Sequence, residues 1–217
     1  MKYALFACLA AALTLAPQAG LAQDGQYVMD YWGFTDQQPT TMNGLGFVDD
    51  IAPPFIWDPV TFQYTWLMDS VTLDSMYTDE FGCEHYFYSG GVYEVYEDIS
   101  WNAIYDDSGE NCSISDPSTF TDGELYLLGN MLSLTLEYFP AYLMGSYQGT
   151  LDLVGGSHLE DIPELLRNGW TFGGVTGEQR ICIPDGYDYR ADGQLFLYED
   201  PTATEESTWG GVKSLFR

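Results

Sequence analysis

Basic residues are scarce in this sequence. Lysine and arginine together number 6 in 217 residues, against 33 aspartates and glutamates, and the formal net charge at pH 7 is −27. A surface this acidic repels DNA, RNA and anionic lipid headgroups, so we expect no nucleic acid as a partner. The same charge attracts cations, although acidity also serves solubility or life in a salty medium that screens self-repulsion.

Cysteine and histidine are scarce as well. Cys8 lies near the N-terminus, which leaves Cys83, Cys112 and Cys182 for the rest of the chain. We predict a disulfide between Cys83 and Cys112, which would stabilise the fold by about 3 kcal/mol in the chain-entropy model. Cys182, between two isoleucines, is expected to be a buried thiol. No two of these cysteines lie close in sequence, so a structural zinc site is not expected.

Long apolar runs are absent except at the N-terminus. Met1-Lys2 is a short positive start, an uncharged apolar run follows as far as Pro17, and Gly20-Leu21-Ala22 offers small residues where a signal peptidase reads them. This pattern is typical of a secretory signal peptide and is too short for a good membrane span. We predict a signal peptide at 1–22, a periplasmic or extracellular location, and no membrane span in the mature chain.

Motifs for catalysis are also missing. There is no Gly-x-Ser-x-Gly, and His85 and His158 are the only histidines that could act as a base. Glu94 and Glu97 are three residues apart on an expected strand, so without a bulge they point to opposite faces and cannot form the carboxylate pair of a glycosidase. We therefore predict no catalytic residues and favour a protein that is not an enzyme.

What the sequence does contain is aromatic residues and alternating segments. Phenylalanine, tryptophan and tyrosine make up 16% of the chain. Residues 62–69 and 147–153 alternate apolar with polar side chains, which is the period of a half-buried strand. The apolar runs that flank Ser89-Gly90-Gly91 and Gly129-Asn130 are typical of β-hairpins with tight turns. After the second turn, a single buried face is predicted for Leu132, Leu134, Leu136 and Tyr138.

Helical patterns are rare. The one good candidate runs from Ser157 to Arg167, and Pro163 argues against a continuous helix there. Many short strands with turn signals and no linker favour a single-domain, all-β fold: an antiparallel β-sandwich or flattened barrel with one short crossover helix. This domain is expected to span 23–204, followed by a basic, amphipathic tail at 205–217.

Two acidic segments are candidate cation sites. Asp106, Asp107 and Glu110 belong to the densest cluster of oxygen ligands in the sequence, and calcium takes about six to eight such oxygens. The spacing matches no EF-hand loop, and an acidic turn is ordinarily a solvated turn. Residues 185–193 form a second, weaker cluster. Calcium is therefore the one cofactor that we consider for this chain.

Trp57 and Trp101 are candidate glycan contacts. Both lie in expected loops, Trp57 close to Pro53-Pro54 and Trp101 next to Asn102. Aromatic rings can stack on the apolar faces of sugars, and acidic side chains can accept hydrogen bonds from sugar hydroxyls. Aromatic residues are also what β cores are built from, so core packing is the competing interpretation for each ring.

Three stretches carry a resemblance to a group of proteins. They are Tyr96-Glu97-Asp98, the run at 118–123, and the ending Trp209-Gly210-Gly211-Val212-Lys213-Ser214-Leu215-Phe216-Arg217. The chain resembles secreted β-rich proteins of environmental Gram-negative bacteria that end in Trp-Gly-x-(Ile/Val)-Lys-x-Leu-(Tyr/Phe)-Arg. The resemblance implies export and a β fold. It assigns no activity, so no functional residue is carried over.

These features favour a secreted, acidic, non-catalytic β protein that acts at the cell surface or outside the cell. Its expected partner is a glycan, a cation or a cell-surface component. The alternatives are a secreted carbohydrate-active hydrolase and a structural subunit of an extracellular matrix. Sugar binding without turnover, release of reducing sugar and concentration-dependent polymerisation would distinguish the three.

The signal peptide gives the first testable prediction. Cleavage after Ala22 should leave a mature protein whose N-terminal sequence begins at Gln23, because the small residues before this bond fit a signal peptidase. N-terminal sequencing of the exported form measures this directly. An exported protein that still begins at Met1 would contradict the prediction.

Overall fold

The computed structural model describes residues 26–108, 112–178 and 182–197. The predicted signal peptide at 1–22 and the predicted tail at 205–217 lie outside the described residues. Glu110 of the predicted calcium cluster also lies outside them. The structure therefore does not bear on these predictions, which stay as they are.

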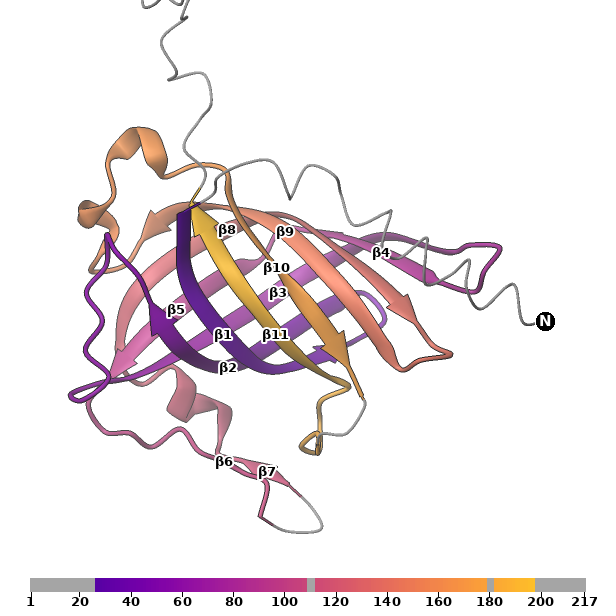
Figure 1. Ribbon diagram of the computed structural model, residues 1–217, viewed down its shortest axis with the longest axis horizontal. Coiled ribbons are helices and arrows are strands. Elements are labelled where there is room, and N and C mark those ends of the chain that lie inside the picture. Colours follow the sequence, from indigo (N-terminus) through magenta and orange to yellow (C-terminus); the bar gives the residue numbers. More distant parts are fainter. Residues whose placement is uncertain (1–25, 109–111, 179–181, 198–217) are drawn as a thin grey trace, which may run out of the picture.

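Antiparallel strands close on themselves to form an eight-position β-barrel (Figure 1). Neighbouring positions follow one another along the chain, and the last strand returns to pair with the first. The strands are β1 (Gln26–Gln37), β2 (Thr41–Ile51), β3 (Gln63–Thr78), β4 (Glu84–Ser89), β5 (Val92–Asp98), β8 (Glu124–Phe139), β9 (Met144–Gly155), β10 (Trp170–Gly177) and β11 (Tyr189–Leu197). The predicted all-β fold is confirmed, and a barrel rather than a sandwich is found.

β4 and β5 share one position in the barrel, between β3 and β8. β5 pairs with residues 63–69 of β3, and β4 pairs with residues 72–78 of the same strand. The hairpin predicted at Ser89-Gly90-Gly91 is therefore wrong, because β4 and β5 continue in the same direction. Gly90 and Gly91 have φ angles of 69° and 78°. These left-handed residues bend one long strand instead of reversing it.

β8 runs straight through Gly129-Asn130, so the second predicted hairpin is also wrong. A Cβ atom at Gly129 would lie 2.8 Å from Cδ1 of Leu151 on the neighbouring strand. Glycine is needed here because a side chain of the adjacent strand occupies the space that a Cβ would fill. A glycine within an alternating pattern thus marks close packing and not a turn.

An irregular register between β8 and β9 changes one inward-facing residue. Leu132 was predicted to share the buried face, but its side chain is 48% exposed. The register shift moves it to the outside, as a bulge does in an antiparallel pair. The prediction is confirmed for the rest of that face, since buried positions are found for Leu134, Leu136 and Tyr138.

Two single 3-10 turns replace the predicted crossover helix between β9 and β10. They are η2 (Leu159–Asp161) and η3 (Glu164–Leu166). Pro163 stands immediately before η3, and its missing N–H and fixed φ are incompatible with the interior of a continuous helix. In the part of the chain that the structure describes, no helix is both long and apolar enough to cross a membrane.

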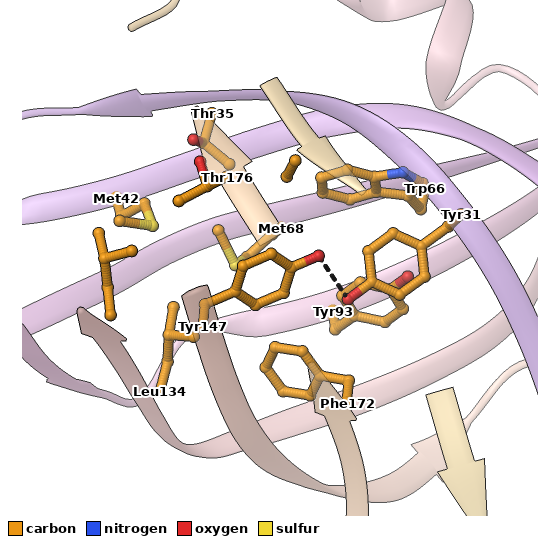
Figure 2. Close-up of a pocket in the computed structure, with 12 residues that line it drawn as sticks. Tyr31, Thr35, Met42, Trp66, Met68, Tyr93, Leu134, Tyr147, Phe172 and Thr176 are labelled. Atoms are coloured by element: carbon orange, nitrogen blue, oxygen red, sulfur yellow. Dashed lines mark hydrogen bonds between the residues drawn. The ribbon is translucent and has the colours of Figure 1, made fainter. Parts of the chain in front are cut away.

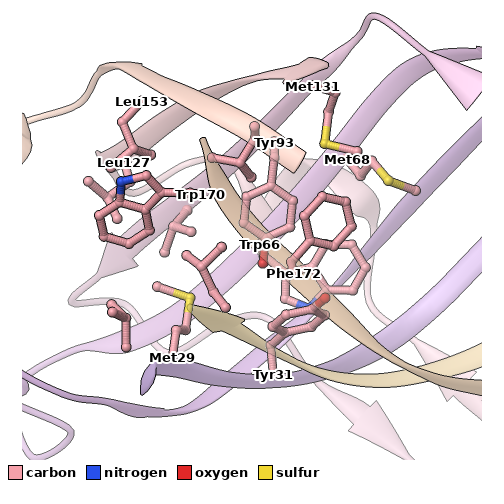
Figure 3. Packing of buried hydrophobic residues seen from close by; sticks show 14 of the residues in the cluster. Met29, Tyr31, Trp66, Met68, Tyr93, Leu127, Met131, Leu153, Trp170 and Phe172 are labelled. Carbon is pink, nitrogen blue, oxygen red and sulfur yellow. The ribbon is translucent and has the colours of Figure 1, made fainter. Parts of the chain in front are cut away.

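These turns and the β2–β3 connection close one end of the barrel with an apolar plug (Figures 1 and 3). Ile162 and Trp170 are fully buried, and the Trp170 indole N–H donates a 2.6 Å hydrogen bond to the Leu166 carbonyl oxygen. The Phe55 ring centroid lies 5.8 Å from that of Tyr126 and 6.1 Å from that of Trp170. Solvent is therefore kept out at this end.

Residues 99–108 and 112–123, the described parts of the segment between β5 and β8, pack on the outer face of β1, β2 and β3. These residues, the outer loop, carry β6 (Tyr105–Asp106), β7 (Ser113–Ile114) and η1 (Pro117–Phe120). Phe120 is fully buried against Phe47, with ring centroids 5.1 Å apart, and Tyr105 lies at the same distance from Phe34. This part of the barrel wall is consequently buried on both sides.

Cys112 in this outer loop forms a disulfide with Cys182, which follows β10 and precedes β11. The predicted Cys83–Cys112 bond and the predicted free thiol at Cys182 are therefore wrong. Cys83 is buried in the turn between β3 and β4 and takes no part in this disulfide. Barrel closure places β11 beside β1, and this brings the two bonded cysteines together across 70 residues of sequence.

The disulfide should contribute to stability by restricting the unfolded chain. A loop of this length is worth about 4 kcal/mol in the chain-entropy model, so the Cys112→Ser/Cys182→Ser variant should lose a free energy of unfolding of that order. Urea denaturation of both proteins measures the loss. Non-reducing peptide mapping supplies the control, and a peptide that joins Cys83 to Cys112 would contradict the assignment.

Candidate binding site in the barrel lumen

The interior of the barrel holds a cavity of about 40 Å³ between the apolar plug and the opposite end (Figure 2). Its walls come from all eight strand positions and are mostly apolar. Five aromatic rings dominate the lining, those of Tyr31, Trp66, Tyr93, Tyr147 and Phe172. The Trp66 and Tyr93 rings are stacked with centroids 5.9 Å apart, and the Tyr93 and Phe172 rings are stacked at 6.1 Å.

Glycines on nearby strands make room for these rings. Gly46 on β2 pairs directly with Trp66 on β3, and a Cβ there would lie 2.7 Å from the indole nitrogen. A Cβ at Gly193 on β11 would overlap the hydroxyl of Tyr147 on β9, two strands away. Because an eight-stranded barrel is only wide enough for its own side chains, large rings lie over positions without side chains.

Three tyrosine hydroxyls are the polar groups of the inner lumen. The Tyr147 hydroxyl donates a 3.2 Å hydrogen bond to the Tyr31 hydroxyl. The Tyr93 hydroxyl is buried and has no hydrogen-bond partner among the described residues. Burial raises the pKa of Tyr31 and of Tyr93 well above the usual value for a phenol, so both stay protonated. Tyr93 is therefore a neutral O–H donor in an apolar chamber.

A second layer of polar side chains lies at the end of the barrel away from the plug. On four strands, the residue two positions beyond a cavity-lining residue is polar, and side chains two apart share a face. These steps are Thr35 to Gln37, Leu136 to Tyr138, Thr176 to Glu178, and Ala191 to Tyr189. β4 adds Tyr86 and Tyr88, whose rings are stacked at 6.3 Å. We call these six residues, together with Glu84, the polar mouth.

Hydrogen bonds tie the polar mouth together. The Tyr86 hydroxyl donates to Glu84 Oε2 at 2.6 Å, the Tyr138 hydroxyl donates to Glu178 Oε1 at 2.5 Å, and the Gln37 amide donates to the Tyr88 hydroxyl at 2.7 Å. Burial raises the pKa of Tyr88 to about 12. Burial, followed by the nearby carboxylates, raises the pKa of Tyr189 to about 12 as well. In these pairs with Glu84 and Glu178, the phenols are thus the donors and the carboxyl oxygens the acceptors.

The two predicted glycan contacts lie near the plug and not in the lumen. The Trp57 ring packs against Tyr64 with centroids 4.7 Å apart and belongs to the core. Trp101 is 48% exposed, and its indole N–H donates to the Thr61 carbonyl oxygen at 3.1 Å. Glycan binding by these residues stays a prediction.

The predicted calcium residues form no metal site in the described chain, where no three acidic, histidine or cysteine side chains converge on one point. Asp106 accepts a hydrogen bond from the Ser108 backbone N–H, as in an ordinary Asx turn. In the second acidic cluster, Asp188 accepts from the Gln37 backbone N–H and Asp192 pairs with Arg190. Calcium at Asp106, Asp107 and Glu110 stays a prediction.

Of the residues considered for catalysis, Glu97 and His158 lie near each other: burial raises the pKa of Glu97, and the neighbouring His158 lowers it. Glu94 instead accepts a hydrogen bond from Tyr96, the next residue on its side of β5. His85 stacks on Tyr77 at 4.6 Å, and His158 stacks on Tyr126 at 4.1 Å beside the plug. Both histidines thus pack against aromatic rings.

The lumen residues were not identified from the sequence as a site. Their alternation was recognised, but the ring of strands that brings Tyr31, Tyr93 and Tyr147 together depends on closure. Tyrosine at inward positions of several strands is the signal that would have indicated a polar interior. Comparison with protein-family models, curated proteins and solved structures found no match to this chain.

The buried phenols predict a loss of stability at alkaline pH. A folded pKa of about 12 for Tyr88 and Tyr189, against about 10 in an unfolded chain, means that the folded state holds these protons longer. The free energy of unfolding should therefore be steady below pH 10 and fall as the pH rises towards 12. Urea denaturation at pH 8, 10 and 11 measures the fall, and Tyr88→Phe should make it shallower. A slope unchanged by that substitution would contradict the assignment.

Proposed function

We propose that this chain is an exported, non-catalytic binding protein whose barrel lumen takes a small, mostly apolar molecule with a hydrogen-bonding group. The observation that carries the proposal is the buried, unpartnered hydroxyl of Tyr93 beside a cavity. A buried polar group without a partner costs about 1–3 kcal/mol, so such groups persist where something satisfies them. An oxygen or nitrogen acceptor on a ligand would receive this proton.

The lining supports an apolar body for the ligand. Apart from the tyrosine hydroxyls and two threonines, the cavity is bounded by rings, methionines, leucines and an alanine. Its 40 Å³ is the volume of about three water molecules, well below the roughly 300 Å³ of ordinary ligand pockets. Met42 and Met68 lie on the wall, and their unbranched side chains can change rotamer to enlarge the space. A slender molecule therefore fits best.

The proposal agrees with the expectation of a non-catalytic secreted protein and specifies a different ligand class. The glycan and cation hypotheses depend on Trp57, Trp101, Asp106, Asp107 and Glu110. The first four are not among the residues that line the lumen cavity, and Glu110 lies outside the described residues. Both hypotheses stay predictions, as do the hydrolase and matrix-subunit alternatives. The lumen is favoured because its unpartnered donor and its cavity coincide.

Binding of straight-chain alcohols tests the proposal. Calorimetric titration with 1-butanol, 1-hexanol and 1-octanol should show saturable binding, because the alkyl chain fits the apolar lining and the hydroxyl accepts from Tyr93. Tyr93→Phe should weaken the best alcohol about tenfold by removing one buried hydrogen bond. The matched control is Tyr96→Phe, a phenol of the same strand that bonds to Glu94 instead, and it should leave affinity unchanged.

The same variant gives a stability measurement without ligand. Tyr93→Phe should raise the free energy of unfolding by about 1–2 kcal/mol, since it removes an unsatisfied buried hydroxyl and keeps the ring. Urea denaturation of the two proteins measures the change. A less stable variant would mean that the hydroxyl is already satisfied, and absence of saturable binding by all three alcohols would overturn the proposed function.

A further inference from the structure

The polar mouth lies at the end of the lumen where a ligand's second end would rest. On four strands, its residues lie two positions beyond a cavity-lining residue, on the same face, which is a distance of about 7 Å along the strand. The opposite end of the cavity meets the apolar plug, in which Trp170 and Ile162 are fully buried. A slender molecule held at Tyr93 can therefore extend only towards the polar mouth, because the plug closes the other end.

The charges at the mouth are negative. Glu84 and Glu178 each accept a hydrogen bond there from a tyrosine hydroxyl. Burial, and then nearby carboxylates, raise the pKa of Tyr138 and of Tyr189; Glu84 and Glu178 act on both rings, and Asp188 also acts on Tyr189. Among the described residues, neither Glu84 nor Glu178 forms an ion pair with a basic side chain. Within that part of the chain, two acceptors without a basic partner thus lie at one end of an apolar chamber.

The basic groups near the mouth that the structure describes point elsewhere. Arg190, on β11 beside Tyr189, pairs with Asp192, and its guanidinium lies 4.8 Å from the centroid of Trp32. Successive residues of a strand face opposite sides, so Arg190 is on the outer wall while Tyr189 faces the mouth. His85 is likewise on the opposite face of β4 from Glu84 and Tyr86, between Asp79 and Glu137.

Aromatic rings at the mouth add a preference for cations. The Tyr138 and Tyr189 ring centroids are 5.0 Å apart, and a cation over a phenol face is attracted by its electron density. The whole chain, with a formal charge of −27, attracts cations and repels anions over longer distances. The groups at the mouth and the net charge of the whole chain therefore both attract cations.

We propose that the lumen selects molecules with two polar ends: a hydrogen-bond acceptor that meets Tyr93, and a protonated amine at Glu84 and Glu178. This inference rests on the proposed function, since it names the ligand class of the same lumen. The apolar middle of the ligand lies among the rings of the cavity. Amino alcohols and amine-bearing phenols of slender shape belong to this class.

Three compounds of equal chain length test the choice of end group. They are 6-amino-1-hexanol, 1,6-hexanediol and 6-hydroxyhexanoate, which keep one hydroxyl for Tyr93 and place an ammonium, a hydroxyl or a carboxylate at the other end. Calorimetric titration at pH 7 in low salt should rank them in that order, with the ammonium compound about tenfold tighter than the diol. Raising sodium chloride to about 0.5 M should narrow this gap by screening.

Variants identify the residues responsible. Glu84→Gln and Glu178→Gln should each reduce the preference for the ammonium compound about threefold and leave diol affinity unchanged, because a neutral amide removes only the charge. Glu94→Gln is the matched control. Glu94 also accepts a hydrogen bond from a tyrosine hydroxyl, that of Tyr96, but it lies on the outer face of β5. It should leave the preference intact.

The outcomes separate the two proposals. If the diol binds but the ammonium compound binds no tighter, the lumen function stands and the amine inference is overturned. The amine inference also fails if the carboxylate compound binds best, or if Glu94→Gln changes the preference as much as the mouth variants do. A preference that survives in both mouth variants overturns it as well. If neither the diol nor 1-hexanol binds to the wild-type protein, the proposed function itself fails.

Discussion

The need to fill the interior of a closed eight-stranded sheet governs this structure. A barrel of this size leaves only enough room for side chains or one small ligand. Here Trp66 and Tyr147 fill the space by lying over Gly46 and Gly193, where a Cβ would collide with them. Filling is incomplete beside Tyr93, whose hydroxyl is left without a partner among the described residues. The binding proposal begins from that one imperfection in an otherwise dense interior.

The two ends of the barrel are filled by different kinds of side chain, so the lumen has one apolar end and one polar end. At one end, the plug around Trp170 removes apolar surface from water, as a core does. At the other end, Tyr138 and its neighbours direct hydroxyls at the carboxylates of Glu84 and Glu178. Phenols suit this place because each presents an apolar ring to the cavity and a hydroxyl to a hydrogen-bonding partner, even at a residue as buried as Tyr138. A ligand that enters at this end can replace hydrogen bonds among these side chains with hydrogen bonds of its own, and the apolar core at the other end stays covered.

Local alternation predicted parts of β3, β8 and β9, because burial of one face imposes a period of two wherever a sheet forms. It did not predict β1 or β2. Alternation predicted the connections wrongly, because a glycine that bends a continuing strand looks the same in sequence as a glycine in a turn that reverses the chain. Gly90 and Gly91 bend a continuing strand, Gly129 makes room for Leu151, and the Cys112–Cys182 bond joins segments that only barrel closure brings together. The candidate site was missed for the same reason, since its tyrosines come from strands far apart in sequence.

The outer loop and its disulfide bear on how the lumen can enlarge. Phe34 and Phe47 on the outer wall are covered by Tyr105 and Phe120, so the wall that carries Tyr31 and Trp66 is packed on both faces. Tightly packed layers resist displacement, because moving a ring on one side opens a void on the other. The opposite wall is different: Val175 on β10 is 54% exposed. Movement of the backbone towards a ligand should therefore fall on β8, β9 and β10, whereas the wall beneath the disulfide-linked loop should keep its backbone in place and make room only through the rotamers of Met42 and Met68.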